Sequence, residues 1–86
     1  MKKLSEAIAE RLKSLMEEKG QSPTQLAQKS RLAAKTVSNI LAAKSEKFCL
    51  TTLNKILKGL GVTYEEFFQG ELFALENLED TRWDKE

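Results

Sequence analysis

The sequence predicts an all-α fold, in which five short helices form a compact domain and a helical extension follows. Apolar residues recur every three or four positions through most of the chain, as they do on one face of a helix. Two capping boxes and two glycines at helix ends divide this pattern into segments. The single proline stands where a helix can begin, since its missing N–H would have no partner there.

The first helix is expected from Leu4 to Glu18. Lys19 and Gly20 follow it, and glycine is the usual residue where a helix ends in a left-handed turn. Its apolar residues follow helical spacing and form one stripe, made of Leu4, Ile8, Leu12, Leu15 and Met16.

The stretch from Ser22 to Lys44 predicts two helices joined by a tight turn. Ser22 can cap the first of them, Pro23 suits its first position, and Gln25 completes a capping box. Ser30 and Arg31 interrupt the apolar pattern. A second helix is then expected to run to about Ala43.

A fourth helix is expected from Leu50 to Leu60, with Gly61 as its left-handed cap. A second capping box, Thr63 with Glu66, predicts that a fifth helix begins at Tyr64. Val62 and Phe67 occupy the positions of a hydrophobic staple around this start. The residues expected to be buried on the fourth helix are Leu50, Leu53, Ile56, Leu57 and Leu60.

The chain continues past Gly70 with a further apolar stripe. Such a segment must fold back on the domain or cover itself against another chain, and a self-complementary helix surface readily forms a two-fold dimer. We therefore place a helix-turn-helix domain at residues 1–69, with the motif at about 22–44, and an acidic extension with a frayed tail at 70–86. The expected dimer contact lies between Phe67 and Leu78 and uses Phe67, Phe68, Leu72, Phe73 and Leu75; packing within the chain is the alternative.

Composition excludes several classes of protein. The chain has 86 residues, enough for one domain, and 41% of them are hydrophobic and 31% charged, without an apolar run that could span a membrane. Its amino terminus lacks the apolar core of a signal peptide, so a cytoplasmic protein is expected. With no histidine and with Cys49 as its only cysteine, the chain offers no usual zinc ligand set, no nucleophile–base pair and no disulfide. We expect neither an enzyme nor a bound cofactor.

The net charge of +1 conceals a strong segregation. Residues 1–60 hold 12 Lys/Arg against 5 Asp/Glu, a balance of +7, whereas residues 61–86 hold 2 against 8, a balance of −6. The basic excess includes the predicted helix-turn-helix, so this part of the chain suits a polyanion.

The second helix of the motif has two different faces. At 100° per residue, its apolar residues fall on one side, and Lys35, Ser38, Asn39 and Ala42 fall on the other. Lysine donates hydrogen bonds to guanine, and asparagine pairs bidentately with adenine, so this polar face suits base edges in the major groove. An ordinary solvated helix face is the alternative interpretation.

The order of these features resembles the phage-repressor and Cro family, also called XRE-type or lambda-repressor-like. The similarity extends from Leu4 to Phe68 and is carried by Leu26-Ala27, Leu32, Thr36-Val37-Ser38 and Ile40, followed by LTTLNKILKGLGVTYEEFF at 50–68. The chain departs from the family's pattern in three places: Pro23 stands in place of a common glutamine, Arg31 in place of a turn glycine, and Ala33-Ala34 in place of polar residues.

The resemblance implies a homodimeric, sequence-specific repressor of transcription that reads a palindromic site in double-stranded DNA. A protein-interaction module, or an antitoxin that binds a toxin through the carboxyl-terminal apolar stripe, is the alternative. Carried over position by position, the implied base contacts are Ala34, Lys35, Ser38 and Asn39, and the implied phosphate contacts are Thr24, Gln25, Lys44 and Lys47.

Overall fold

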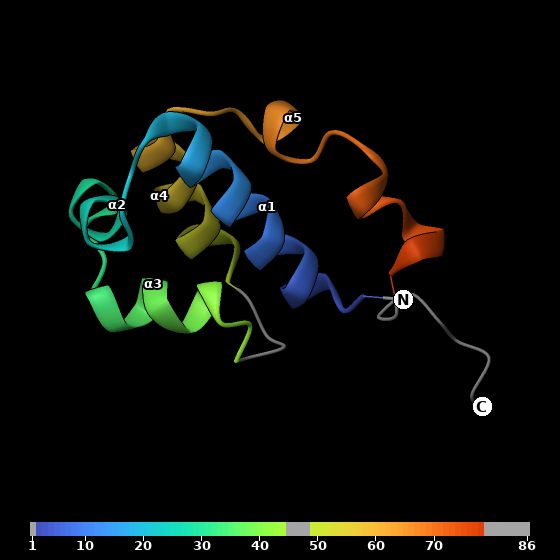
Figure 1. Ribbon diagram of the computed structural model, residues 1–86, viewed down its shortest axis with the longest axis horizontal. Coiled ribbons are helices and arrows are strands. Elements are labelled where there is room, and N and C mark those ends of the chain that lie inside the picture. Colours follow the sequence, from blue (N-terminus) through green and yellow to red (C-terminus); the bar gives the residue numbers. More distant parts are fainter. Residues whose placement is uncertain (1, 45–48, 79–86) are drawn as a thin grey trace.

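Five α-helices and two single 3-10 turns follow one another along the chain (Figure 1). The computed structural model describes residues 2–44 and 49–78. The helices are α1 (Leu4–Lys19), α2 (Pro23–Ser30), α3 (Ala34–Leu41), α4 (Leu50–Leu60) and α5 (Tyr64–Phe67), and the 3-10 turns are η1 (Glu71–Phe73) and η2 (Leu75–Asn77).

Local capping signals determine where two of these helices begin. At α2, the Ser22 hydroxyl accepts a hydrogen bond from the Gln25 amide at 3.2 Å, and the Gln25 side chain accepts one from the Ser22 amide at 2.9 Å. At α5, Thr63 and Glu66 make the same reciprocal pair at 3.1 and 3.0 Å. These bonds stabilise the carboxylate form, so the backbone and hydroxyl of Thr63 lower the pKa of Glu66. Both predicted capping boxes are confirmed.

Left-handed residues end the helices and turn the chain. Gly61 takes this conformation after α4, as predicted, and Gly20 takes it where α1 ends. Ala43 takes it after α3 with φ 53°, and α3 ends at Leu41, two residues earlier than expected. An alanine gives no signal for such a turn, since its Cβ disfavours the conformation.

The core lies where α1, α2, α3 and α4 meet. Helix α2 packs against α4 and α3, and α1 packs against α3 and α4. One apolar cluster connects them all, made of Ile8, Leu12, Leu15, Met16, Leu26, Ala27, Val37, Leu53, Ile56, Leu57, Leu60 and Phe67.

Two residues expected in the core lie at its edge. Leu50 is 73% exposed and Leu4 is 37% exposed. Each is the first residue of its helix. Side chains of a helix point back toward its amino terminus, so a side chain in this position extends past the packed part of the helix. The prediction that Leu50 is buried was therefore wrong.

Helices α2 and α4 approach closely at Ser30 and Gly59. A Cβ added to Gly59 would overlap the Ser30 hydroxyl and lie 3.1 Å from the Ser30 amide nitrogen and 3.3 Å from the Lys29 carbonyl carbon. Ser30 is 4% exposed, and its hydroxyl has no hydrogen-bond partner within the described part of the chain. The missing side chain of Gly59 allows this contact.

The segment after α5 folds back on the domain. Gly70, with φ 94°, turns the chain, and the expected helical extension is two single 3-10 turns instead. Leu78 is 3% exposed and forms a parallel bridge with Lys2, which places the segment beside the amino terminus (Figure 1).

The end of α5 is fixed by aromatic packing and by one arginine. Phe67 is fully buried, so it belongs to the core and not to a dimer surface. The ring of Phe73 lies 5.6 Å from that of Phe67 and packs against the core. Arg11 donates hydrogen bonds to the carbonyls of Phe67 and Glu66 at 2.9 and 2.7 Å. Of the residues predicted for the dimer contact, Phe67 is therefore buried in the core, and Phe73 packs mostly against its own chain.

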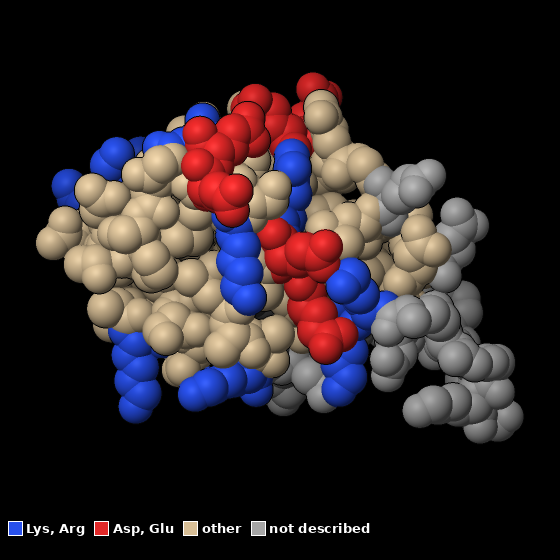
Figure 2. All heavy atoms as spheres, in the orientation of Figure 1, with Lys and Arg blue, Asp and Glu red and all other residues tan. Residues whose placement is uncertain are grey.

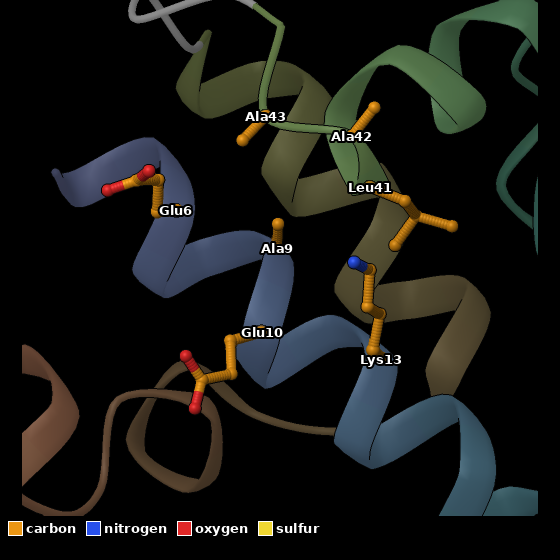
Figure 3. A pocket seen from close by; sticks show the side chains of 7 residues that line it. All are labelled: Glu6, Ala9, Glu10, Lys13, Leu41, Ala42 and Ala43. Atoms are coloured by element: carbon orange, nitrogen blue, oxygen red, sulfur yellow. The ribbon is translucent and has the colours of Figure 1, made fainter. Parts of the chain in front are cut away.

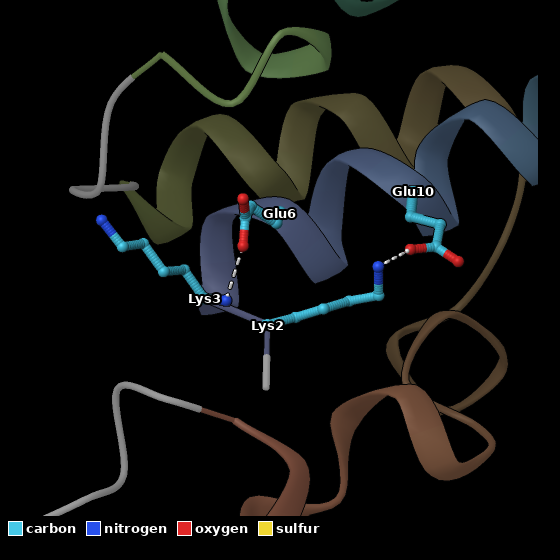
Figure 4. A network of polar contacts seen from close by, with 4 residues as sticks. All are labelled: Lys2, Lys3, Glu6 and Glu10. Carbon is cyan, nitrogen blue, oxygen red and sulfur yellow. Dashed lines mark hydrogen bonds and ion pairs between the residues drawn. The ribbon is translucent and has the colours of Figure 1, made fainter.

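Acidic residues of α1 hold the amino-terminal residues (Figure 4). The Lys3 amide donates to the Glu6 carboxylate at 2.9 Å, and the Lys2 ammonium pairs with the Glu10 carboxylate at 2.8 Å. These contacts cap α1 and anchor the residue that bridges to Leu78. Among the described residues, no helix is long and apolar enough to cross a membrane.

Candidate nucleic-acid interface

Helix α3 runs along one edge of the molecule, the lower edge in Figure 1, and it carries a polar face. Val37, which is 1% exposed, holds the opposite face of α3 in the core, with Ile40 and Leu41 packed beside it. The structure places the four predicted base-contacting residues on or beside the outer face: Ala34, Lys35 and Ser38 are exposed and Asn39 is partly buried.

The start of α3 is open to a ligand. Its cap residue, Ala33, makes no side-chain hydrogen bond to the helix. The first N–H groups of a helix have no partner within it, and together with the helix dipole they favour an anion. Because no side chain caps α3, donors remain available beside Lys35, apart from the Thr36 amide, which donates to the Ala33 carbonyl at 3.0 Å.

The predicted phosphate contacts lie at both ends of the motif. Thr24 and Gln25 are exposed in the first turn of α2, and Lys44 is exposed just beyond α3. The side-chain oxygen of Gln25 is occupied by the Ser22 amide. Its NH₂ group is the part that can donate to a phosphate. Lys47 lies outside the described residues.

The turn between α2 and α3 is left-handed at Arg31, the position where the family resemblance places a glycine. Arg31 is left-handed, with φ 57° and ψ 41°. Its amide donates to the Gln28 carbonyl at 3.2 Å, and the Leu32 amide donates to the Ala27 carbonyl at 2.9 Å. This pair of bonds turns the chain from α2 into α3 although no glycine is present.

Acidic and basic side chains are unevenly distributed over the surface (Figure 2). Acidic side chains gather over α1 and α5 on the face shown, whereas basic side chains extend from the lower edge beneath α3. Among the described residues, neither Lys35 nor Lys44 forms an ion pair, while Lys2 does. The edge that carries the polar face of α3 therefore carries free positive charge.

A groove of about 310 Å³ separates α1 from the end of α3 (Figure 3). Glu6 and Glu10 line its α1 side together with Lys13, and Leu41 to Ala43 line the other. Two carboxylates disfavour a phosphate there. The described residues also contain no cluster of His, Cys, Asp or Glu that could hold a metal ion. The outer side of α3, and not this groove, suits a nucleic acid.

Comparison with known proteins decides the family. The Cro/C1-type helix-turn-helix DNA-binding domain matches residues 11–71.

The chain belongs to the Cro/C1-type helix-turn-helix family.

As a member of this family, the chain is a DNA-binding regulator of transcription and not an enzyme. Two crystal structures of single-site mutants of the restriction-modification controller protein C.Esp1396I resemble it. One is 32% identical, with a TM-score of 0.71 over 76% of this chain and 85% of the other. The second is 29% identical, with a TM-score of 0.72 over 79% and 86%. No curated protein matches the sequence. The all-helical Cro/C1-type fold predicted from the sequence is confirmed.

Proposed function

We propose that this Cro/C1-type protein is a homodimeric repressor that reads a palindromic site in double-stranded DNA through the major groove. The observation that carries the proposal is the exposed polar face of α3, which lies between free basic side chains and has an uncapped amino terminus. A dimer bound at its site would cover that stretch of DNA and thereby repress transcription. Similarity to C.Esp1396I favours a restriction-modification controller among such regulators.

The proposed base contacts are Lys35, Ser38 and Asn39, with the methyl group of Ala34 available to a thymine. Lysine and asparagine supply donors to guanine and a bidentate pair to adenine. The proposed phosphate contacts are Thr24 and Gln25 at the start of α2, and Lys44 with Lys47 after α3. Phosphate contacts fix the register of the protein on the duplex, whereas contacts to base edges determine sequence preference.

The roles of these two groups can be separated by electrophoretic mobility shifts on a selected site and on random duplexes. Asn39→Ala should weaken binding to the selected site by about 1 to 3 kcal/mol and relax preference at one base pair. Lys44→Ala should weaken both duplexes alike and reduce the salt dependence. Lys13→Ala removes the same charge as a control, since Lys13 lies on α1, in the groove between α1 and the end of α3. Equal losses on both duplexes for Asn39→Ala would contradict its assignment to a base.

The proposed dimer surface is the apolar part of the carboxyl-terminal segment that remains uncovered. Leu75 is 67% exposed and Phe68 is 38% exposed, with partly buried Leu72 between them in the chain. Tyr64, 43% exposed, extends this surface from the start of α5. Two copies joined by a two-fold axis would present two α3 helices to successive major grooves, roughly 34 Å apart.

Sedimentation tests the dimer independently of DNA. Leu75→Glu should shift the equilibrium toward monomer, because it places a charge in the contact. Leu50→Glu is a matched control, since Leu50 is 73% exposed but lies at the start of α4. A wild-type monomer at high micromolar concentration would contradict the dimer. The same apolar surface would then favour the second candidate function, an antitoxin-like module that binds a partner protein there.

A further inference from the structure

A hollow of about 390 Å³ lies between the end of α2 and the second half of α4, and we call it the basic hollow. It is lined by Lys29, Ser30, Arg31, Lys55 and Lys58. The four charged residues are exposed, and no carboxylate lines the hollow. Within residues 2–44 and 49–78, none of the four forms an ion pair. The basic hollow is thus a concentrated positive charge without a counterion from the described residues.

The contact between Ser30 and Gly59 brings these charges together. Lys29 and Arg31 flank Ser30, while Lys58 precedes Gly59 and Lys55 lies one helical turn before it. Because Gly59 has no side chain, the two backbones approach closely, and the four cations converge from segments that are distant in the sequence. Like charges brought together repel one another unless an anion lies among them.

Arg31 is held at the hollow in a conformation that glycine adopts without strain. Its φ of 57° places a residue with a Cβ in the left-handed region. Strained residues cluster at functional sites, where the side chain has a role that offsets the strain. A guanidinium can donate two parallel hydrogen bonds to one phosphate, and lysines add charge around it.

We propose that the basic hollow binds a ligand with two or more adjacent phosphate groups. Its lining contains no aromatic or large apolar side chain that could hold a base, so recognition rests on charge. The hollow is separate from the proposed phosphate contacts at Thr24 and Gln25, because it lies at the other end of α2, roughly 8 Å further along the helix at 1.5 Å per residue. The phosphates come either from a free polyphosphate or nucleotide, or from the backbone of a duplex.

Calorimetric titration with sodium tripolyphosphate at low salt tests the binding. The wild-type protein should bind it, and the double variant Lys55→Gln with Lys58→Gln should bind at least 10-fold more weakly. A second double variant, Lys13→Gln with Lys19→Gln, removes the same charge outside the hollow and should bind as the wild type does. Absence of binding to the wild-type protein, or equal binding by all three proteins, would overturn the proposal.

Thermal unfolding of the same proteins separates lost binding from lost folding. Without tripolyphosphate, the Lys55→Gln with Lys58→Gln variant should unfold at the wild-type temperature or above it, because repulsion in the hollow is relieved. Tripolyphosphate should raise the unfolding temperature of the wild type and of the charge-matched control by more than that of this variant. An equal rise in all three would show that the anion acts elsewhere.

Binding to random duplexes then distinguishes the two sources of phosphate. One outcome is that the Lys55→Gln with Lys58→Gln variant binds DNA as tightly as the charge-matched control but binds tripolyphosphate more weakly. In that case the ligand is a free phosphoanion. If the variant also loses DNA affinity, with a shallower salt dependence than the control, the hollow holds phosphates of a duplex.

Discussion

The close approach of α2 and α4 makes Gly59→Ala the most informative change to the fold. The new Cβ would overlap the Ser30 hydroxyl and would lie 3.1 Å and 3.3 Å from backbone atoms of Ser30 and Lys29. The hydroxyl can rotate away, but the backbone atoms can move only with α2. Overpacking of this kind costs about 1 to 3 kcal/mol.

The opposing effect is the better helix propensity of alanine, about 1 kcal/mol in favour of the variant. We therefore expect a net loss of up to about 2 kcal/mol in the free energy of unfolding, measured by urea denaturation. Ser30→Ala should be neutral or stabilising alone, since it removes a buried hydroxyl without a partner. In the double variant it should recover part of the loss, giving a coupling of about 0.5 kcal/mol or more. A Gly59→Ala protein more stable than the wild type would refute the reasoning.

Three further changes test local features of the fold by urea or acid denaturation. Arg31→Gly should raise the free energy of unfolding by about 0.5 to 1 kcal/mol because it removes a Cβ from a left-handed position, whereas Arg31→Ala, which keeps the Cβ, should bring no such gain. Ser22→Ala should lower it by about 1 kcal/mol through loss of the α2 cap; an unchanged value would mean that the cap contributes nothing. The lowered pKa of Glu66 stabilises the fold above the ordinary pKa of about 4.5, and this contribution is lost as the pH falls below that value. Glu66→Gln keeps the capping box and should therefore lose less stability between pH 7 and pH 3 than the wild type; an equal loss would contradict this.

The helix starts could be predicted because their signals are local. Ser22 with Gln25, and Thr63 with Glu66, specify α2 and α5 within four residues of sequence, and both pairs form as expected. The end of α3 could not be predicted, since an alanine gives no local signal for the left-handed turn at Ala43.

The prediction of which side chains are buried was least accurate near the ends of helices. Periodicity assigned Leu50 to the core although the helix begins there, and it assigned Phe67 to a dimer surface although Val62 and Phe67 had the spacing of a staple. A pattern of apolar positions shows which face is covered, but it does not show what covers it. Phe73 and Leu78 fold back on the same chain, and no local signal distinguishes that from contact with a second copy.

The outward position of polar residues on α3 was predictable from the helical period, whereas their contacts with DNA stay a prediction. Lys35 and Ser38 face outward as the 100° rotation requires. The basic hollow was not predictable, because it depends on one glycine in α4 meeting one serine in α2. Those residues are far apart in the sequence, and neither carries charge itself.

The central claim is that the polar face of α3 reads a specific palindromic site. Selection of bound duplexes from a random pool tests it most directly, followed by alignment of the enriched sequences. The account predicts one enriched family with inverted half-sites about 10 base pairs apart from centre to centre, whose preference at one position in each half-site is lost with Asn39→Ala. A pool that remains random after repeated selection, although the wild-type protein is folded, would contradict it.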